Sequence, residues 1–62
     1  MGPYTKQEQQ ELADYWRSYG YTGITAWESG EIIGVKQGQQ HVVMSPAEAQ
    51  RWLEAVGLRG ER

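Results

Sequence analysis

His41 is the side chain best suited to acid–base chemistry in this sequence, because imidazole ordinarily titrates near neutral pH. It is the only histidine in the chain. A histidine acting as a general base needs a nucleophile or an orienting carboxylate beside it. In the sheet expected from the sequence, its cross-strand neighbours are Gly34 and, diagonally, Lys36. Neither supplies that partner, so we interpret His41 as a partly exposed sheet residue.

Glu28 and Glu31 are a second candidate, because paired carboxylates act as acid and base in glycosidases and also bind divalent cations. Such catalytic pairs lie in clefts, where burial raises one pKa. Here they flank Ser29 and Gly30, a sequence typical of a turn, in a chain of only 62 residues. A domain of this size can hardly enclose a cleft, so we interpret both as solvated turn residues.

The remaining polar residues carry no catalytic signature. No serine has a neighbouring histidine in the sequence, and no glycine-rich run leads into a helix as a phosphate loop would. Gly34 lies within an expected strand, where glycine indicates close packing against a larger side chain. The chain has no cysteine, which excludes disulfides and thiolate zinc sites. We therefore expect no enzyme activity, no metal and no cofactor.

Composition limits the other classes of function. Sixty-two residues make one domain, which we take as residues 1–62. The formal net charge is −2, and no segment is basic enough to track a phosphate backbone. The apolar stretches are too short to span a membrane. A polar N-terminus without a secretory signal, in a chain without cysteine, leads us to expect a cytoplasmic protein.

Two helices are expected from their capping signals. Thr5 followed by Glu8 is a capping box, and Gly20 suits a helix end, which predicts a helix over 6–19. Ser45, with Pro46 at the first helical position, begins a second helix over 46–56. The apolar stripes of the two helices are Leu12, Tyr15, Trp16 and Tyr19 in the first, and Ala49, Trp52, Leu53 and Val56 in the second.

Between the helices the pattern changes to short strands separated by glycine turns. Ser29-Gly30 and Gln37-Gly38 suit two-residue hairpin turns, because glycine tolerates the positive φ that these turns require. The predicted strands are 24–28, 31–36 and 39–44, and a frayed tail is expected at 59–62.

The turn length sets which side chains share a face of the sheet. A two-residue first turn places Trp27 opposite Ile32, and a two-residue second turn places Gly34 opposite His41. The face expected to form the core then carries Ile24, Ala26, Ile33, Val35, Val42 and Met44. The other face carries Thr25, Trp27, Ile32, Gly34, Lys36, Gln39, His41 and Val43.

One detail opposes this register. It sets Glu28 opposite Glu31, and like charges directly across a hairpin are unfavourable. A longer first loop would separate them, and a slip by an odd number of residues would exchange the faces of the first strand relative to the second.

The predicted fold is α+β, in the order α-β-β-β-α, with a three-stranded antiparallel meander packed against two helices. Whether both helices lie on one face is left open. We expect a small non-enzymatic protein-interaction module, a regulator, adaptor or inhibitor of a larger partner. Its expected binding residues lie on the second face of the sheet, where an apolar row is set among polar neighbours. They are Trp27, Ile32, Lys36, His41 and Val43.

Nucleic-acid binding is the alternative, disfavoured by the acidic composition. It would use the same sheet face together with Arg51, Arg59 and Arg62. A homodimer is the third kind of association considered, because so small a domain buries little surface by itself. No membrane partner is expected.

Overall fold

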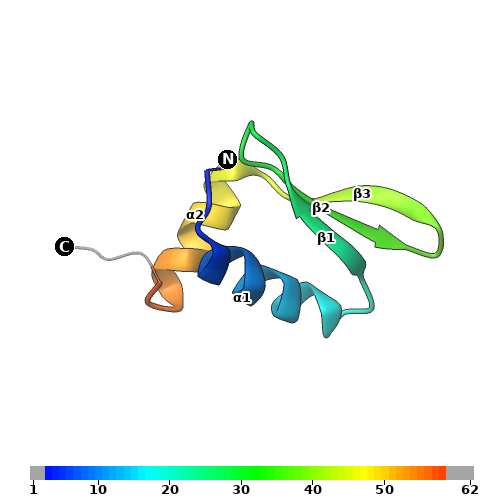
Figure 1. Cartoon of the computed structure of the whole chain (residues 1–62), viewed down its shortest axis with the longest axis horizontal. Coiled ribbons are helices and arrows are strands. Elements are labelled where there is room, and N and C mark those ends of the chain that lie inside the picture. Colours follow the sequence, from blue (N-terminus) through cyan, green and yellow to red (C-terminus); the bar gives the residue numbers. More distant parts are fainter. Residues whose placement is uncertain (1–2, 59–62) are drawn as a thin grey trace.

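The computed structural model describes residues 3–58, so the predicted tail at 59–62 lies outside the described residues. It confirms the α+β order (Figure 1). The strands form one antiparallel sheet in the order β1-β2-β3. The elements are α1 (Lys6–Arg17), β1 (Thr22–Ala26), β2 (Ile32–Lys36), β3 (Gln39–Met44) and α2 (Pro46–Ala55).

Helix α1 begins at the predicted residue. The Glu8 backbone N–H donates to the Thr5 hydroxyl over 3.1 Å, and the Thr5 N–H donates to the Glu8 carboxylate over 3.0 Å. The helix ends at Arg17 rather than at residue 19. The last turn tightens there, because the Tyr19 N–H donates to the Trp16 carbonyl only three residues back.

Helix α2 begins at the predicted residue and ends at Ala55, one residue before the predicted end. Ser45 and Glu48 form a reciprocal capping box, with bonds of 3.1 and 3.2 Å. At the other end Gly57 has a φ of +84°, and the Leu58 N–H donates to the Leu53 carbonyl over 2.9 Å. This is the Schellman ending expected from a glycine followed by an apolar residue.

The second hairpin has the predicted two-residue turn. Gln37 and Gly38 have φ values of +54° and +79°, as a primed turn requires. Lys36 pairs with Gln39, and this register continues through Gly34 opposite His41. Near the end of β3 a bulge makes Met44, rather than the predicted Val43, the partner of Ile32.

The predicted two-residue turn of the first hairpin is wrong. The Trp27 N–H donates to the Glu31 carbonyl, and the Gly30 N–H donates to the Trp27 carbonyl, both over 2.9 Å. Three residues therefore form the loop, with Gly30 at a φ of +101°. Ala26 consequently pairs with Ile32, so β1 is slipped by one residue and its faces are exchanged relative to β2.

A second irregularity lies between Thr22 and Thr25 in β1. The one-residue slip at the first hairpin changes which residues face the helices. Ile24, Ala26 and Met44 face the core as predicted. Ile33, Val35 and Val42 do not, and their assignment to the core face is wrong. Ile32 takes the place of Ile33.

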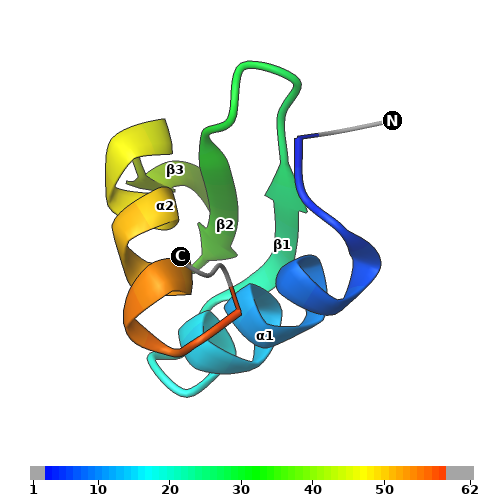
Figure 2. The ribbon, with the colours of Figure 1, turned by 90° about the vertical axis from the view of Figure 1, so that its left-hand side faces the viewer.

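Both helices pack on one face of the sheet, which resolves the alternative left open by the sequence. Figure 2 shows α1 beneath β1 and α2 in front of β3, and side chains of both helices join Ile32 in one buried cluster. The apolar side chains of the two helices pack against β2 and the end of β3. The buried cluster consists of Tyr4, Leu12, Ile32, Met44, Ala49 and Leu53. This is the hydrophobic core of the described chain.

Tyr4 connects the N-terminal segment to this core. Its hydroxyl donates a buried hydrogen bond to the Gly30 carbonyl in the first hairpin loop. A β-carbon on Gly30 would lie only 3.1 Å from the Pro46 Cβ. The segment before α1, the first hairpin loop and the start of α2 therefore meet at one point.

Removing the Tyr4 hydroxyl is expected to destabilise the fold. In the Tyr4→Phe variant the buried Gly30 carbonyl loses its side-chain donor, which costs about 1–3 kcal/mol. Urea denaturation followed by tryptophan fluorescence measures this loss. Tyr21→Phe is the matched control, because the Tyr21 hydroxyl makes no hydrogen bond among residues 3–58. Equal stability of the two variants would contradict the prediction.

Candidate binding surface

The sheet face that the helices leave uncovered is the candidate site, and we call it the outer face. Trp27 and Val42 are 48% and 58% exposed on it. Its residues include Thr25, Trp27, Ile33, Val35, Gln40 and Val42, and Glu31 lies opposite Trp27 next to the first hairpin loop.

The loop of the first hairpin positions the Trp27 ring. Ala26 points to the core, so the next side chain along the strand points to the outer face. Thr25 pairs with Ile33, which makes Trp27 a diagonal neighbour of Ile33, within reach of an aromatic side chain. Ile33 is only 3% exposed although no helix covers its face.

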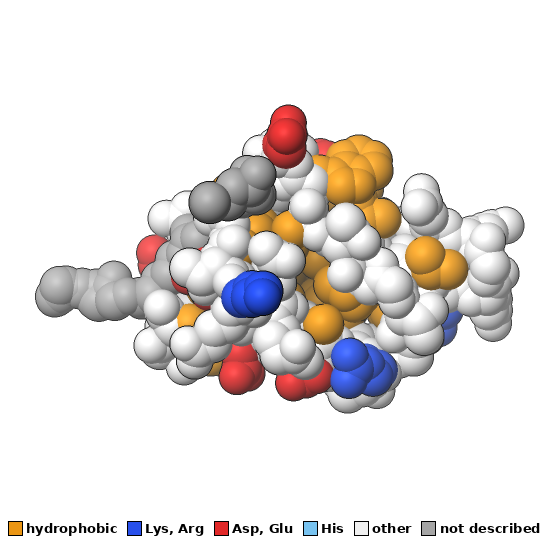
Figure 3. Space-filling view, in the orientation of Figure 1, with side chains coloured by type: hydrophobic (Ala, Val, Ile, Leu, Met, Phe, Trp, Pro, Cys, Tyr) orange, Lys and Arg blue, Asp and Glu red, His pale blue; other side chains and the backbone are white. Residues whose placement is uncertain are grey.

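A shallow depression of about 150 Å³ lies on this surface, lined by Trp27, Ile33, Gln40, His41 and Val42. In Figure 3, hydrophobic side chains emerge beside the turn between β1 and β2 and again further along the hairpin. The outer face therefore combines an exposed aromatic ring, a shallow depression and an apolar floor.

The five residues predicted to bind do not share one face, and that part of the prediction is wrong. Trp27 lies on the outer face. Ile32 is 1% exposed and belongs to the core, and Val43 packs half-buried against it. The Lys36 side chain and the His41 ring lie beside Tyr21, on the other side of the sheet from Trp27, although His41 also lines the depression. The one-residue slip of β1 is the physical cause, because it separates Trp27 from Ile32. Whether any of these residues binds a partner stays a prediction.

Lys36 and His41 are brought together around Tyr21. The Lys36 ammonium lies 5.0 Å from the centre of the Tyr21 ring and donates to the Tyr19 carbonyl over 3.2 Å. The His41 ring meets Tyr21 edge-on, at 6.2 Å between centroids. Lys36 is thus held by local contacts. Among residues 3–58, no carboxylate forms a hydrogen bond or ion pair with His41 that would orient it as a base.

An aromatic cluster joins the two helices. Tyr15 contacts Trp52 of α2 at 5.0 Å between ring centroids, and Trp16 contacts Tyr21 at 5.5 Å. A hydrogen bond with Tyr19, followed by loss of solvent, raises the pKa of Tyr15 above that of an ordinary tyrosine. We assign this cluster to packing, as the helical spacing predicted.

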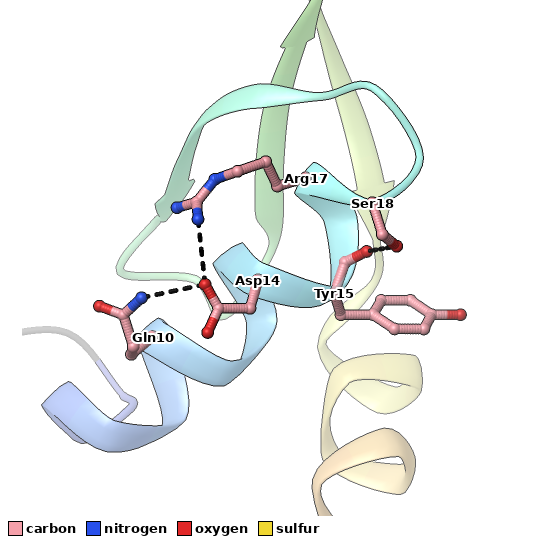
Figure 4. Close-up of polar contacts among 5 residues, drawn as sticks. All are labelled: Gln10, Asp14, Tyr15, Arg17 and Ser18. Carbon is pink, nitrogen blue, oxygen red and sulfur yellow. Dashed lines mark hydrogen bonds and ion pairs between the residues drawn. The ribbon is translucent and has the colours of Figure 1, made fainter.

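A groove between α1 and β1 was not anticipated from the sequence. It has a volume of about 620 Å³ and is lined by Lys6, Gln7, Gln9, Gln10, Ala13, Arg17 and Ile24. Arg17 and Gln10 both donate to the Asp14 carboxylate over 3.1 Å (Figure 4). The described lining residues of the groove include no histidine, cysteine, serine or threonine. The sequence did not show that β1 lies beside this polar part of α1.

The described residues show no metal-binding group. Within residues 3–58, no three side chains of His, Cys, Asp or Glu are grouped to hold an ion. None of the helices over the same range has the length and apolar character needed to cross a membrane.

Comparison with known proteins provides no relative from which to transfer a function. No protein-family model matches the chain. Curated proteins and solved structures likewise give no significant match. The functional argument therefore rests on the geometry of the outer face.

Proposed function

We propose that this protein is a non-enzymatic interaction module that docks onto a protein partner through its outer face. The observation that carries the proposal is the half-exposed Trp27 ring beside Ile33 and Val42, on a sheet face that neither helix covers. Tryptophan is enriched among the few residues that supply most of the energy of protein–protein association.

The surroundings of Trp27 suit such an interface. An apolar centre with a polar rim is typical of protein-binding surfaces. Here the rim includes the exposed Glu28 and the half-buried Glu31, whose carboxylate accepts from the Ser29 hydroxyl over 3.2 Å. The partner expected from this charge offers apolar side chains to the depression and lysine or arginine near the first hairpin loop.

Nucleic-acid binding remains the second proposal, with less support. Trp27 lies across the sheet from Lys36 and His41, so one strand could not contact all three on a single face. Arg51 is exposed on α2, whereas Arg59 and Arg62 lie outside the described residues. Oligonucleotide binding at low salt that weakens steeply as salt is added would support this alternative.

Replacing Trp27 with alanine is expected to abolish partner binding while the fold is retained. Loss of an interface residue of this kind costs at least about 2 kcal/mol, or an approximately 30-fold weaker complex. The chain would be used to capture partners from its native host, and each partner would then be titrated against the wild type and the Trp27→Ala variant.

The matched control is Tyr19→Ala, which removes another exposed aromatic ring, 54% accessible and located after α1. We expect this variant to bind like the wild type. A folded Trp27→Ala variant that retained every partner at full affinity would contradict the proposal.

A further inference from the structure

The two edges of the sheet differ in how well they are protected. Exposed edge strands are usually blocked by bulges, charged side chains, proline or a covering element. The β1 edge has an irregularity between Thr22 and Thr25. Strand β3 has none of these devices from Gln39 to Val42, and all four of its residues there are exposed. Figure 1 shows this part of the hairpin projecting beyond the helices.

The register shows which backbone groups of β3 are free to pair. The two-residue turn makes Lys36 and Gln39 a hydrogen-bonded pair, and bonded pairs alternate along an antiparallel ladder. His41 therefore bonds back to β2. The N–H and C=O groups of Gln40 and Val42 point outward from the sheet.

We propose that two copies of this chain pair through β3, antiparallel, with the two-fold axis at His41. Gln40 of each copy then lies opposite Val42 of the other. This makes two pairs, each exchanging two backbone hydrogen bonds. The product is a continuous six-stranded sheet, three strands from each copy, with both Trp27 surfaces on the same side.

A second copy fits this edge because the edge is complementary to itself. The strand from Gln39 to Met44 carries no Asp, Glu, Lys or Arg, so pairing it with itself opposes no such like charges across the ladder. Val42, 58% exposed in the single chain, gains a neighbour in Gln40 of the second copy. A two-fold axis is also the commonest symmetry of protein oligomers.

Amide hydrogen exchange at increasing protein concentration tests the proposal directly. At low concentration the Gln40 and Val42 amides should exchange much faster than those of Gln39 and His41. Sedimentation equilibrium measures the fraction of dimer at each concentration. Protection of the Gln40 and Val42 amides from exchange should increase together with that fraction. A chain that stays monomeric to millimolar concentration would overturn the proposal. So would a dimer that leaves these two amides unprotected.

A backbone variant tests whether the β3 edge or the β1 edge forms the contact between the two copies. The chain is short enough for chemical synthesis, and N-methylation at Gln40 removes an outward donor without disturbing the pairing of β3 with β2. N-methylation at Ala26 is the control, because the register places its N–H on the free edge of β1. We expect the first variant to be monomeric and the second to dimerise. The opposite result would assign the contact to β1 and overturn the proposal. Partner binding through Trp27 is measured separately and does not depend on this result.

Discussion

Replacing Leu53 with alanine is expected to remove a large share of the free energy that holds the chain folded. Leu53 is fully buried in the core cluster with Leu12 and Ala49. Truncating a buried leucine to alanine costs about 2–5 kcal/mol, because it removes apolar burial and leaves a cavity. Roughly 0.05–0.15 kcal/mol per residue gives a chain of 62 residues a total stability of about 3–9 kcal/mol. The loss is therefore comparable with the whole stability of the fold.

Urea denaturation and far-ultraviolet circular dichroism would measure this effect. The matched control is Val56→Ala at the end of the same helix, because Val56 is 49% exposed and its truncation leaves no enclosed cavity. We expect that control to remain folded. A Leu53→Ala variant as stable as Val56→Ala would show that Leu53 does not hold the two helices and the sheet together.

Replacing Gly34 with alanine is expected to be the next most damaging change. A β-carbon at this position would lie 2.9 Å from Ile24 Cδ1 and 3.1 Å from Tyr21 Cδ1. Gly34 is in the central strand, so its neighbours on both sides restrict relaxation. Overpacking of this kind costs about 1–3 kcal/mol. The structure thereby confirms the close packing that a glycine within a strand predicted.

A double variant identifies the atoms responsible. Ile24→Val removes the Cδ1 atom that would clash most severely, so it should recover part of the stability lost in Gly34→Ala, with a coupling of about 1 kcal/mol. Ile33→Val removes the same atom type from the opposite face of the sheet. The Ile33→Val control should lower the stability by its own amount and should restore none of the stability lost in Gly34→Ala. Equal coupling for both pairs would contradict the steric explanation.

The helices could be predicted from the sequence because their signals act locally. Ser45, Pro46 and Glu48 satisfy the first backbone groups of α2 within a single turn of chain, and Gly57 ends the helix in the same way. No distant residue is needed for these contacts. The prediction of the second hairpin succeeded for the same reason, since its turn requires only two residues with positive φ.

The first hairpin failed because its local signal is compatible with two registers. Gly30 is acceptable as the second residue of a two-residue turn and also as the left-handed third residue of a longer loop. The longer loop leaves Trp27, rather than Glu28, paired with Glu31. The choice moves the side chains of Thr25 and Ala26, and with them Trp27, to the opposite face relative to β2, so a single loop residue decided whether the predicted binding residues would lie together.

The sequence by itself determined the order of the elements, the ends of the helices and the presence of an apolar sheet face. Tertiary structure decided which face is buried. Ile32 and Ile33 are adjacent and chemically identical, so hydrophobicity alone gives no preference between them. Burying the Ile32 face also places Gly34 under Tyr21 and Ile24, which fit there only because glycine has no side chain. The contacts of Tyr21 and Ile24 with Gly34 therefore favour this register, which leaves Trp27 on the outer face.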